Sequence, residues 1–235
     1  MALNVVTLKT RSLTAVVFIA VMLVGLLWNT WSFFILFTVI HFGCWYELVK
    51  LMKQIYGNKY LPYCLFGLIY ITLPILMFIN TGITFMNETF AGESGTGSFI
   101  GFEFSNLLPC TIIFSMWIND TMAYMVGSLI GKTPFSKISP KKTWEGTIGG
   151  GILCIIVIAT IAYFSHLLSV KDAIIIAVLC AIFGTIGDLV ESKLKRMANV
   201  KDSGAIMPGH GGFLDRFDSL LFAAPAVWVY VKLFM

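Results

Sequence analysis

Residues 147–168 read TIGGGILCIIVIATIAYFSHLL, a run without a single Asp, Glu, Lys or Arg. A helix needs roughly 20 mainly apolar residues to cross the hydrocarbon core of a bilayer, so this stretch predicts a membrane-spanning helix. Six other apolar blocks of similar length lie at 13–28, 31–49, 61–79, 107–130, 173–190 and 220–234. The sequence therefore predicts an all-α, polytopic integral membrane protein with about seven transmembrane helices.

The overall composition excludes a soluble enzyme, a disordered chain and a nucleic-acid-binding domain. Hydrophobic residues make up 58% of the chain, charged residues only 12%, and the mean hydropathy is +0.88. Soluble domains carry about 25% charged residues. We expect one membrane-embedded domain over residues 1–235, with N-terminal helices in 1–106 and the catalytic region in 107–235. The five cysteines lie in or beside apolar stretches, which favours packing over a disulfide or a metal site.

The basic residues predict the orientation of the chain, because Lys and Arg are retained on the cytoplasmic side of a membrane. With the N-terminus inside, all 16 basic residues except Lys171 and Lys232 fall on that side. The opposite loop at 80–106 contains acidic residues and no basic one. We expect a multi-pass protein of the inner (plasma) membrane with a cytoplasmic N-terminus and an uncleaved first helix.

Four aspartates stand out beside the apolar blocks, within two segments expected to be cytoplasmic loops: Asp120, Asp188, Asp215 and Asp218. An ionised carboxylate at the edge of a membrane is costly unless it faces a cavity, a cation or a partner. Hard oxygen ligands of this kind suit Mg²⁺. The alternative is helix capping, which is an equally good explanation of Asp218. Because Asp215 and Asp218 are three apart, they lie on one face if the last helix begins there.

Cations accompany these carboxylates on the same predicted side, including the pair Lys141-Lys142. Anchoring at anionic headgroups explains their clustering, but they are interleaved with Ser, Gly and Asp. Cations, free backbone amides and a metal are the components of a phosphoryl or nucleotidyl transfer site. His210, between glycines, is either a base or ligand, or makes a structural hydrogen bond.

Residues 192–218 read SKLKRMANVKDSGAIMPGHGGFLDRFD. This string is similar, without a gap, to the signature of the phosphatidate cytidylyltransferase family, also called CDP-diacylglycerol synthases. Met207 and Phe213 depart slightly from the family pattern and keep their positions apolar. Segments 119–132 (NDTMAYMVGSLIGK) and 139–146 (SPKKTWEG) also resemble the family, apart from Met122, and so does the N-terminal hairpin.

The resemblance implies an enzyme that transfers a cytidylyl group from CTP to phosphatidate, giving CDP-diacylglycerol and pyrophosphate, at the cytoplasmic interface of the bilayer. It implies Mg²⁺, with room for a second cation, held by Asp188, Asp215, Asp218 and Asp120. The residues expected to be catalytic are Asp188, Asp215, Lys195 and Arg196. Those expected to bind substrate are Ser139, Lys142, Ser192, Lys201, His210 and Arg216. A homodimer is compatible with this expectation.

Three other classes of membrane protein fit the sequence less well. A CTP-dependent polyprenol or phytol kinase would lack the complete HGG-x2-DR-x-D string of residues 210–218. A CDP-alcohol phosphotransferase would carry a different aspartate motif, which this chain does not contain. A transporter would place its ionisable residues near the bilayer midplane, whereas here they gather mainly at one predicted side.

Overall fold

The computed structural model describes residues 5–89, 104–136, 138–204 and 211–235, with side chains from residue 12 onward apart from 84–89. The described chain is built from helices and contains no β-strand, which confirms the all-α prediction. Its long helices are α1 (Val5–Leu27), α2 (Thr30–Tyr56), α4 (Leu73–Thr89), α5 (Leu107–Ile130), α6 (Trp144–Ser165), α7 (Val170–Met197) and α8 (Leu214–Phe234). The short α3 (Leu61–Cys64) and a π-helical turn, η2 (Leu68–Thr72), lead into α4.

Each of the seven predicted apolar blocks has a helix in the structure. Five helical stretches within the described residues are long and apolar enough to cross a membrane: Thr30–Lys59, Leu61–Ile83, Trp144–Ser165, Val170–Met197 and Leu214–Phe234. A shorter apolar helix runs over Ser12–Leu27. Helix α5 falls outside this set, in keeping with the polar pair Asn119-Asp120 in its middle. The chain is a multi-pass membrane protein.

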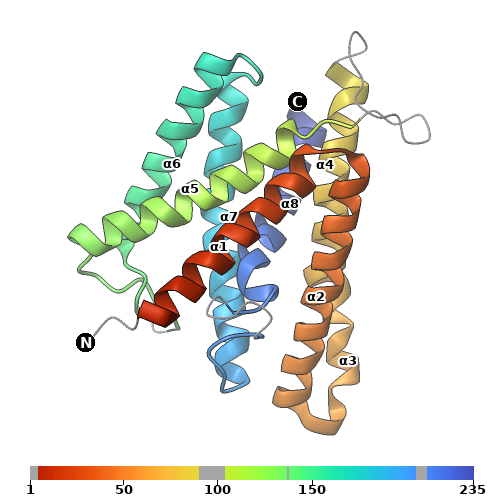
Figure 1. Ribbon diagram of the computed structural model, residues 1–235, viewed down its shortest axis with the longest axis vertical. Helices are drawn as coiled ribbons and strands as arrows, with labels where there is room; N and C mark the ends of the chain where they lie inside the picture. The colour runs from red at the N-terminus through yellow and green to blue at the C-terminus, as the bar shows by residue number, and fades with distance from the viewer. Residues whose placement is uncertain (1–4, 90–103, 137, 205–210) are drawn as a thin grey trace.

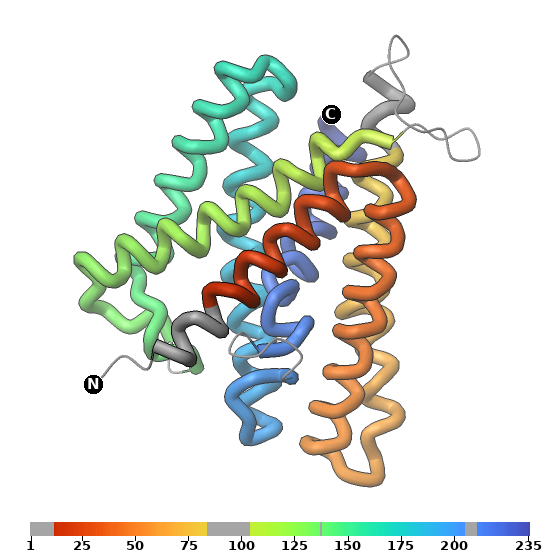
Figure 2. The backbone as a smooth tube through the Cα atoms, viewed as in Figure 1, coloured from red at the N-terminus to blue at the C-terminus, as the bar shows by residue number. Residues whose placement is uncertain are grey.

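Helix α7 lies in the middle of the molecule, between α5 and α6 on one side and α2 and α4 on the other (Figure 1). Helix α8 packs against α7 and α4, and α6 packs against α5 and α7. Helices α1 and α5 run obliquely to the others (Figure 2). The N-terminus and the α2–α3 turn lie toward one end of the molecule, and the C-terminus and the α6–α7 turn toward the other (Figure 1).

The interior and the outer surface are both apolar, as expected when the surrounding solvent is lipid. Inside, Phe33, Phe37 and Phe78 are fully buried, with ring centroids 4.6 Å apart between Phe37 and Phe78. On the outside of α6, Ile148, Ile152 and Ile156 are more than half exposed and recur every fourth residue. Residues four apart share one helix face, so this stripe forms an apolar surface that suits contact with acyl chains.

Helices α5 and α6 cross closely because small residues meet at the crossing. A Cβ atom added to Gly150 would lie 2.5 Å from the backbone nitrogen of Ala123, and one added to Gly146 would lie 2.8 Å from the carbonyl oxygen of Ala123. Gly146 and Gly150 are four apart, the spacing of the small-xxx-small motif that lets membrane helices approach each other. This crossing fixes the position of α5, which carries Asp120, against the first turns of α6.

The close crossing of α5 and α6 predicts that alanine substitutions at two adjacent glycines have different effects on the melting temperature. We expect Gly150→Ala to lower the apparent melting temperature of the detergent-solubilised protein, because overpacking a tight contact costs about 1–3 kcal/mol. Gly151→Ala is the matched control, since its added Cβ would meet nothing closer than 3.6 Å. Alanine also favours helix over glycine by about 1 kcal/mol, so Gly151→Ala should leave the melting temperature unchanged or raise it. Equal melting temperatures for the two variants would contradict the close crossing.

Candidate active site

A cavity of about 390 Å³ lies where α5, α7, α8 and the start of α6 meet. All four predicted aspartates and the predicted lysine Lys142 are among its lining residues: Asp120, Asp188, Asp215, Asp218 and Lys142. Neutral polar groups complete the polar part of its wall, including Asn119, Thr143, Thr185 and Ser219. Residues from both predicted segments therefore gather at one site, although Asp120 and Asp188 lie 68 positions apart in the sequence.

The aspartates lie on helices, which corrects the expectation that loops carry most of the site. Helix α7 continues past Asp188 to Met197, because residues 188–197 contain no glycine or proline and include several good helix formers. Helix α8 begins at Leu214. Asp215 and Asp218 therefore occupy its first turns on one face, as their spacing predicts. Helices hold these carboxylates more rigidly than loops would.

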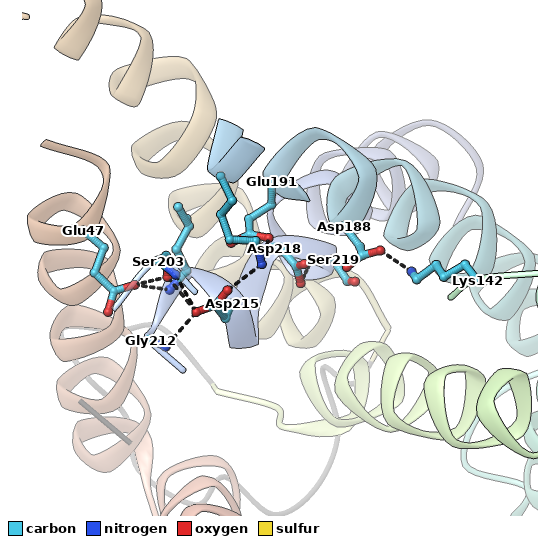
Figure 3. A network of polar contacts seen from close by, with 11 residues as sticks. Glu47, Lys142, Asp188, Glu191, Ser203, Gly212, Asp215, Asp218 and Ser219 are labelled. Carbon is cyan, nitrogen blue, oxygen red and sulfur yellow. Dashed lines mark hydrogen bonds and ion pairs between the residues drawn. The ribbon is translucent and has the colours of Figure 1, made fainter. Parts of the chain in front are cut away.

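The segment before α6 brings Lys142 to Asp188. Thr143 caps α6 by accepting a hydrogen bond from the backbone N–H of Gly146 at 3.1 Å. The carboxylate of Glu145 accepts from the hydroxyl of Thr133 at 2.8 Å, which ties the α5–α6 connection to α6. With the connection held in this way, the ammonium of Lys142 forms an ion pair with the carboxylate of Asp188 (Figure 3).

Asp215 is the centre of a polar network (Figure 3). Its Oδ1 accepts from Lys195 Nζ at 2.6 Å, and its Oδ2 accepts from the backbone N–H groups of Ser203 and Gly212 at 2.9 and 2.8 Å. Lys195 also forms an ion pair at 2.5 Å with Glu191, which is fully buried. Lys195, predicted to be catalytic, thus bridges two carboxylates and is not part of the cavity wall.

The cavity wall contains carboxylate oxygens of the kind that bind a metal ion, but among the described residues they do not surround a single point. Among the described residues, no three His, Cys, Asp or Glu side chains gather closely enough to hold a metal. Asp218 is buried and accepts a hydrogen bond from the neutral backbone N–H of Ser219 at 2.6 Å. Mg²⁺ characteristically uses one or two protein carboxylates together with water and substrate phosphates. The carboxylates present therefore fit an ion that enters with a nucleotide.

The other predicted residues that the structure describes do not line this cavity. Arg196 and Lys201 are exposed, and Ser192 is half-buried on α7. Ser139 lies in a turn, where its backbone carbonyl accepts a hydrogen bond from the N–H of Lys142 at 3.1 Å. Arg216 lies with Asp120 along a separate groove of about 380 Å³ between α1 and α5. His210 lies outside the described residues.

Three residues of the network were missed in the sequence analysis. All three are buried: Glu47, Glu191 and Ser203. Ser203 binds both Asp215 and Glu47, and Glu191 binds Lys195, the cation that pairs with Asp215. The sequence could have indicated Glu47, because it is the one charged residue in the apolar block 31–49. Glu191 lies next to the signature string and Ser203 lies within it. Many residues of this string are polar, and the sequence alone does not indicate which of them are buried.

Comparison with known proteins gives this geometry a context. Residues 95–234 match the model of the cytidylyltransferase family. The chain belongs to this family. The match covers α5 to α8, and so every residue that lines the cavity.

Relatives of the chain include proteins named phosphatidate cytidylyltransferase. Identity is 35% over 196 residues with that of Staphylococcus aureus (strain COL), covering 79% of this chain and 70% of the relative. It is 48% over 112 residues with that of Staphylococcus haemolyticus (47% and 43%) and 46% over 128 residues with that of Bacillus subtilis (53% and 46%). The chain thus spans less than half the length of the last two relatives in these matches.

Proposed function

We propose that this member of the family transfers a cytidylyl group from CTP to phosphatidate, releasing pyrophosphate and leaving CDP-diacylglycerol in the membrane. The observation that carries the proposal is a cavity in a bundle of membrane-protein helices whose wall contains Asp120, Asp188, Asp218 and Lys142, with Lys142 paired to Asp188 (Figure 3). The names of the relatives support the choice of lipid and nucleotide. A soluble nucleotide and a lipid phosphate can meet only at a site of this kind, at the edge of the bilayer.

The chemistry requires cations more than it requires a base. A phosphate oxygen of phosphatidate attacks the α-phosphorus of CTP, the bond to the β-phosphate oxygen breaks, and pyrophosphate leaves. Both reactants are polyanions, so Lys141 and Lys142 in the cavity wall reduce their repulsion and orient the triphosphate. Mg²⁺, and a second cation, would neutralise charge on the transferred phosphate and on the leaving group. From the sequence we expected Asp188 and Asp215 to be the main metal ligands. Because both oxygens of Asp215 already accept from Lys195 and from backbone N–H groups, Asp188 and Asp218 would hold the metal, with Asp120 and Asp215 in support.

Two grooves beside the cavity suit the lipid. One, of about 400 Å³, lies between α1 and α2 and is lined almost entirely by apolar side chains, including Phe217 of α8 and Phe213, which precedes it. The other contains Arg216 and Asp120 together with apolar residues of α1. Acyl chains in an apolar groove would leave the lipid phosphate near Arg216, at the end of the bundle where the basic residues gather. We place this end at the cytoplasmic face of the inner membrane; a homodimer stays a prediction.

The proposal predicts that pyrophosphate release needs three components together. Purified, detergent-solubilised protein should release pyrophosphate with CTP, phosphatidate and Mg²⁺, and should stop when any one is withheld. Diacylglycerol is the matched control substrate, because it lacks the attacking phosphate. Formation of CDP without pyrophosphate would instead indicate a lipid kinase. Absence of any CTP turnover by well-folded protein would contradict the proposal.

A further inference from the structure

Glu47 is a fully buried carboxylate on an otherwise apolar stretch of α2, far in sequence from the residues it binds. Its Oε1 accepts from the backbone N–H of Phe213 at 2.9 Å, and its Oε2 accepts from the backbone N–H of Leu214 at 2.8 Å. The hydroxyl of Ser203 lies 2.6 Å from the same Oε2. All three of these donors are neutral, so the partners of Glu47 here are hydrogen-bond donors and not an ion-pairing cation.

These contacts make Glu47 the cap of α8. The first N–H groups of a helix have no partner within the helix and need an acceptor. The residue at the usual capping position, Phe213, has no side chain that can supply one. A carboxylate from α2 does so instead, and its negative charge also interacts favourably with the helix N-terminus. The start of the helix that carries Asp215 and Asp218 is therefore fixed from a different part of the chain.

The loop backbone is shaped around this carboxylate. A Cβ atom on Gly212 would lie 2.1 Å from Glu47 Oε1, and one on Gly204 would lie 2.2 Å from the same oxygen. Four residues before Glu47, a Cβ on Gly43 would lie 2.3 Å from the ring of Phe213. Glycine on both sides of the contact thus allows α2 and the signature segment to approach closely.

Ser203 links Glu47 to the cavity. Its hydroxyl lies 2.6 Å from Glu47 and 2.9 Å from Asp215 Oδ2, and its backbone N–H donates to Asp215 at 2.9 Å. Figure 3 shows Glu47 at one end of this row of polar contacts and the Lys142–Asp188 pair at the other. A change at Glu47 therefore alters the partners of Asp215 without touching the wall of the cavity.

We infer that Glu47 is a positioning residue of the transfer reaction. It holds Ser203 and residues 212–214 in the arrangement that aims Asp215 and Asp218 at the cavity. This inference deepens the proposed function and rests on it for the reaction, although the contacts on which it depends can be tested separately.

The test compares Glu47→Gln with Lys50→Gln, a control at an exposed position one turn further along α2. An amide keeps only one acceptor oxygen and turns its NH₂ group toward a donor. We expect backbone amides in the segment 211–216 of Glu47→Gln to exchange deuterium at least about tenfold faster, with α6 unchanged. We expect kcat per folded molecule to fall about 10- to 100-fold and KM for CTP to change much less. Glu47→Asp, which keeps both oxygens, should recover part of kcat.

Each result of this comparison either supports or overturns the role inferred for Glu47. Unchanged exchange in folded Glu47→Gln, or a lower folded fraction with kcat per folded molecule intact, would overturn the inference. Faster exchange in the variant, combined with a wild-type protein that releases no pyrophosphate, would overturn the proposed function and support the capping role. If Glu47→Gln does not fold, Ser203→Ala tests the effect on kcat alone, since it removes the hydroxyl between Glu47 and Asp215 and leaves the cap of α8 in place. We then expect kcat to fall with exchange in 211–216 unchanged, and an unchanged kcat would overturn the inference.

Discussion

Asp215→Asn should reduce pyrophosphate release by at least about two decades, the size of effect seen when one key electrostatic group is removed from an active site. One oxygen of Asp215 binds the ammonium of Lys195, and the other accepts from two backbone N–H groups. An asparagine must turn its NH₂ group toward one of these donors in either orientation. The rate of pyrophosphate release with CTP, phosphatidate and Mg²⁺ measures the loss.

Asp172→Asn is the matched control for this substitution. Asp172 also accepts hydrogen bonds at both of its oxygens, from the hydroxyls of Ser169 and Tyr230, but it lies at the opposite end of α7 from Asp188. Its replacement should leave the rate within about threefold of wild type, as expected for a change away from the reaction. Equal losses in the two variants would mean that the rate reports on folding, and an active Asp215→Asn protein would remove Asp215 from the site.

Lys195→Met should be strongly destabilising, because it leaves two carboxylates without their shared cation. Glu191 is fully buried, and the side chain of Lys195 is only 14% exposed. Removing one partner of a buried ion pair costs about 3–5 kcal/mol. For a chain of this length each kcal/mol lowers the melting temperature by about 2–4 °C, so we expect a decrease of about 6 °C or more in detergent.

Two further variants isolate the cause of that loss. Lys193→Met changes the same residue type at an exposed position of α7 and should leave the melting temperature nearly unchanged. Adding Glu191→Gln to Lys195→Met removes one of the unpaired charges and should recover part of the stability. A double variant as unstable as the sum of the single changes would show that Glu191 and Lys195 do not interact.

The length of the apolar blocks predicted a helix in each of them, because the bilayer imposes a length and forbids unpaired backbone groups. Block 107–130 corresponds residue for residue to α5. The boundaries near the site were less predictable. The predicted block 173–190 ended where a run of charged residues begins at Glu191, whereas α7 continues to Met197, since charged residues such as Glu, Lys and Arg are good helix formers once the chain leaves the lipid.

The sequence by itself determined the family and the polytopic architecture, and it singled out the four aspartates that line the cavity. Hydrophobic block length, a carboxylate beside an apolar block and the long string at 192–218 are all local properties of the chain. Only the tertiary structure decided which polar groups meet. Lys142, in the connection before α6, pairs with Asp188 of α7, and Glu47 caps a helix that begins 167 residues later. Such contacts depend on how the helices pack, and no spacing within one segment encodes them.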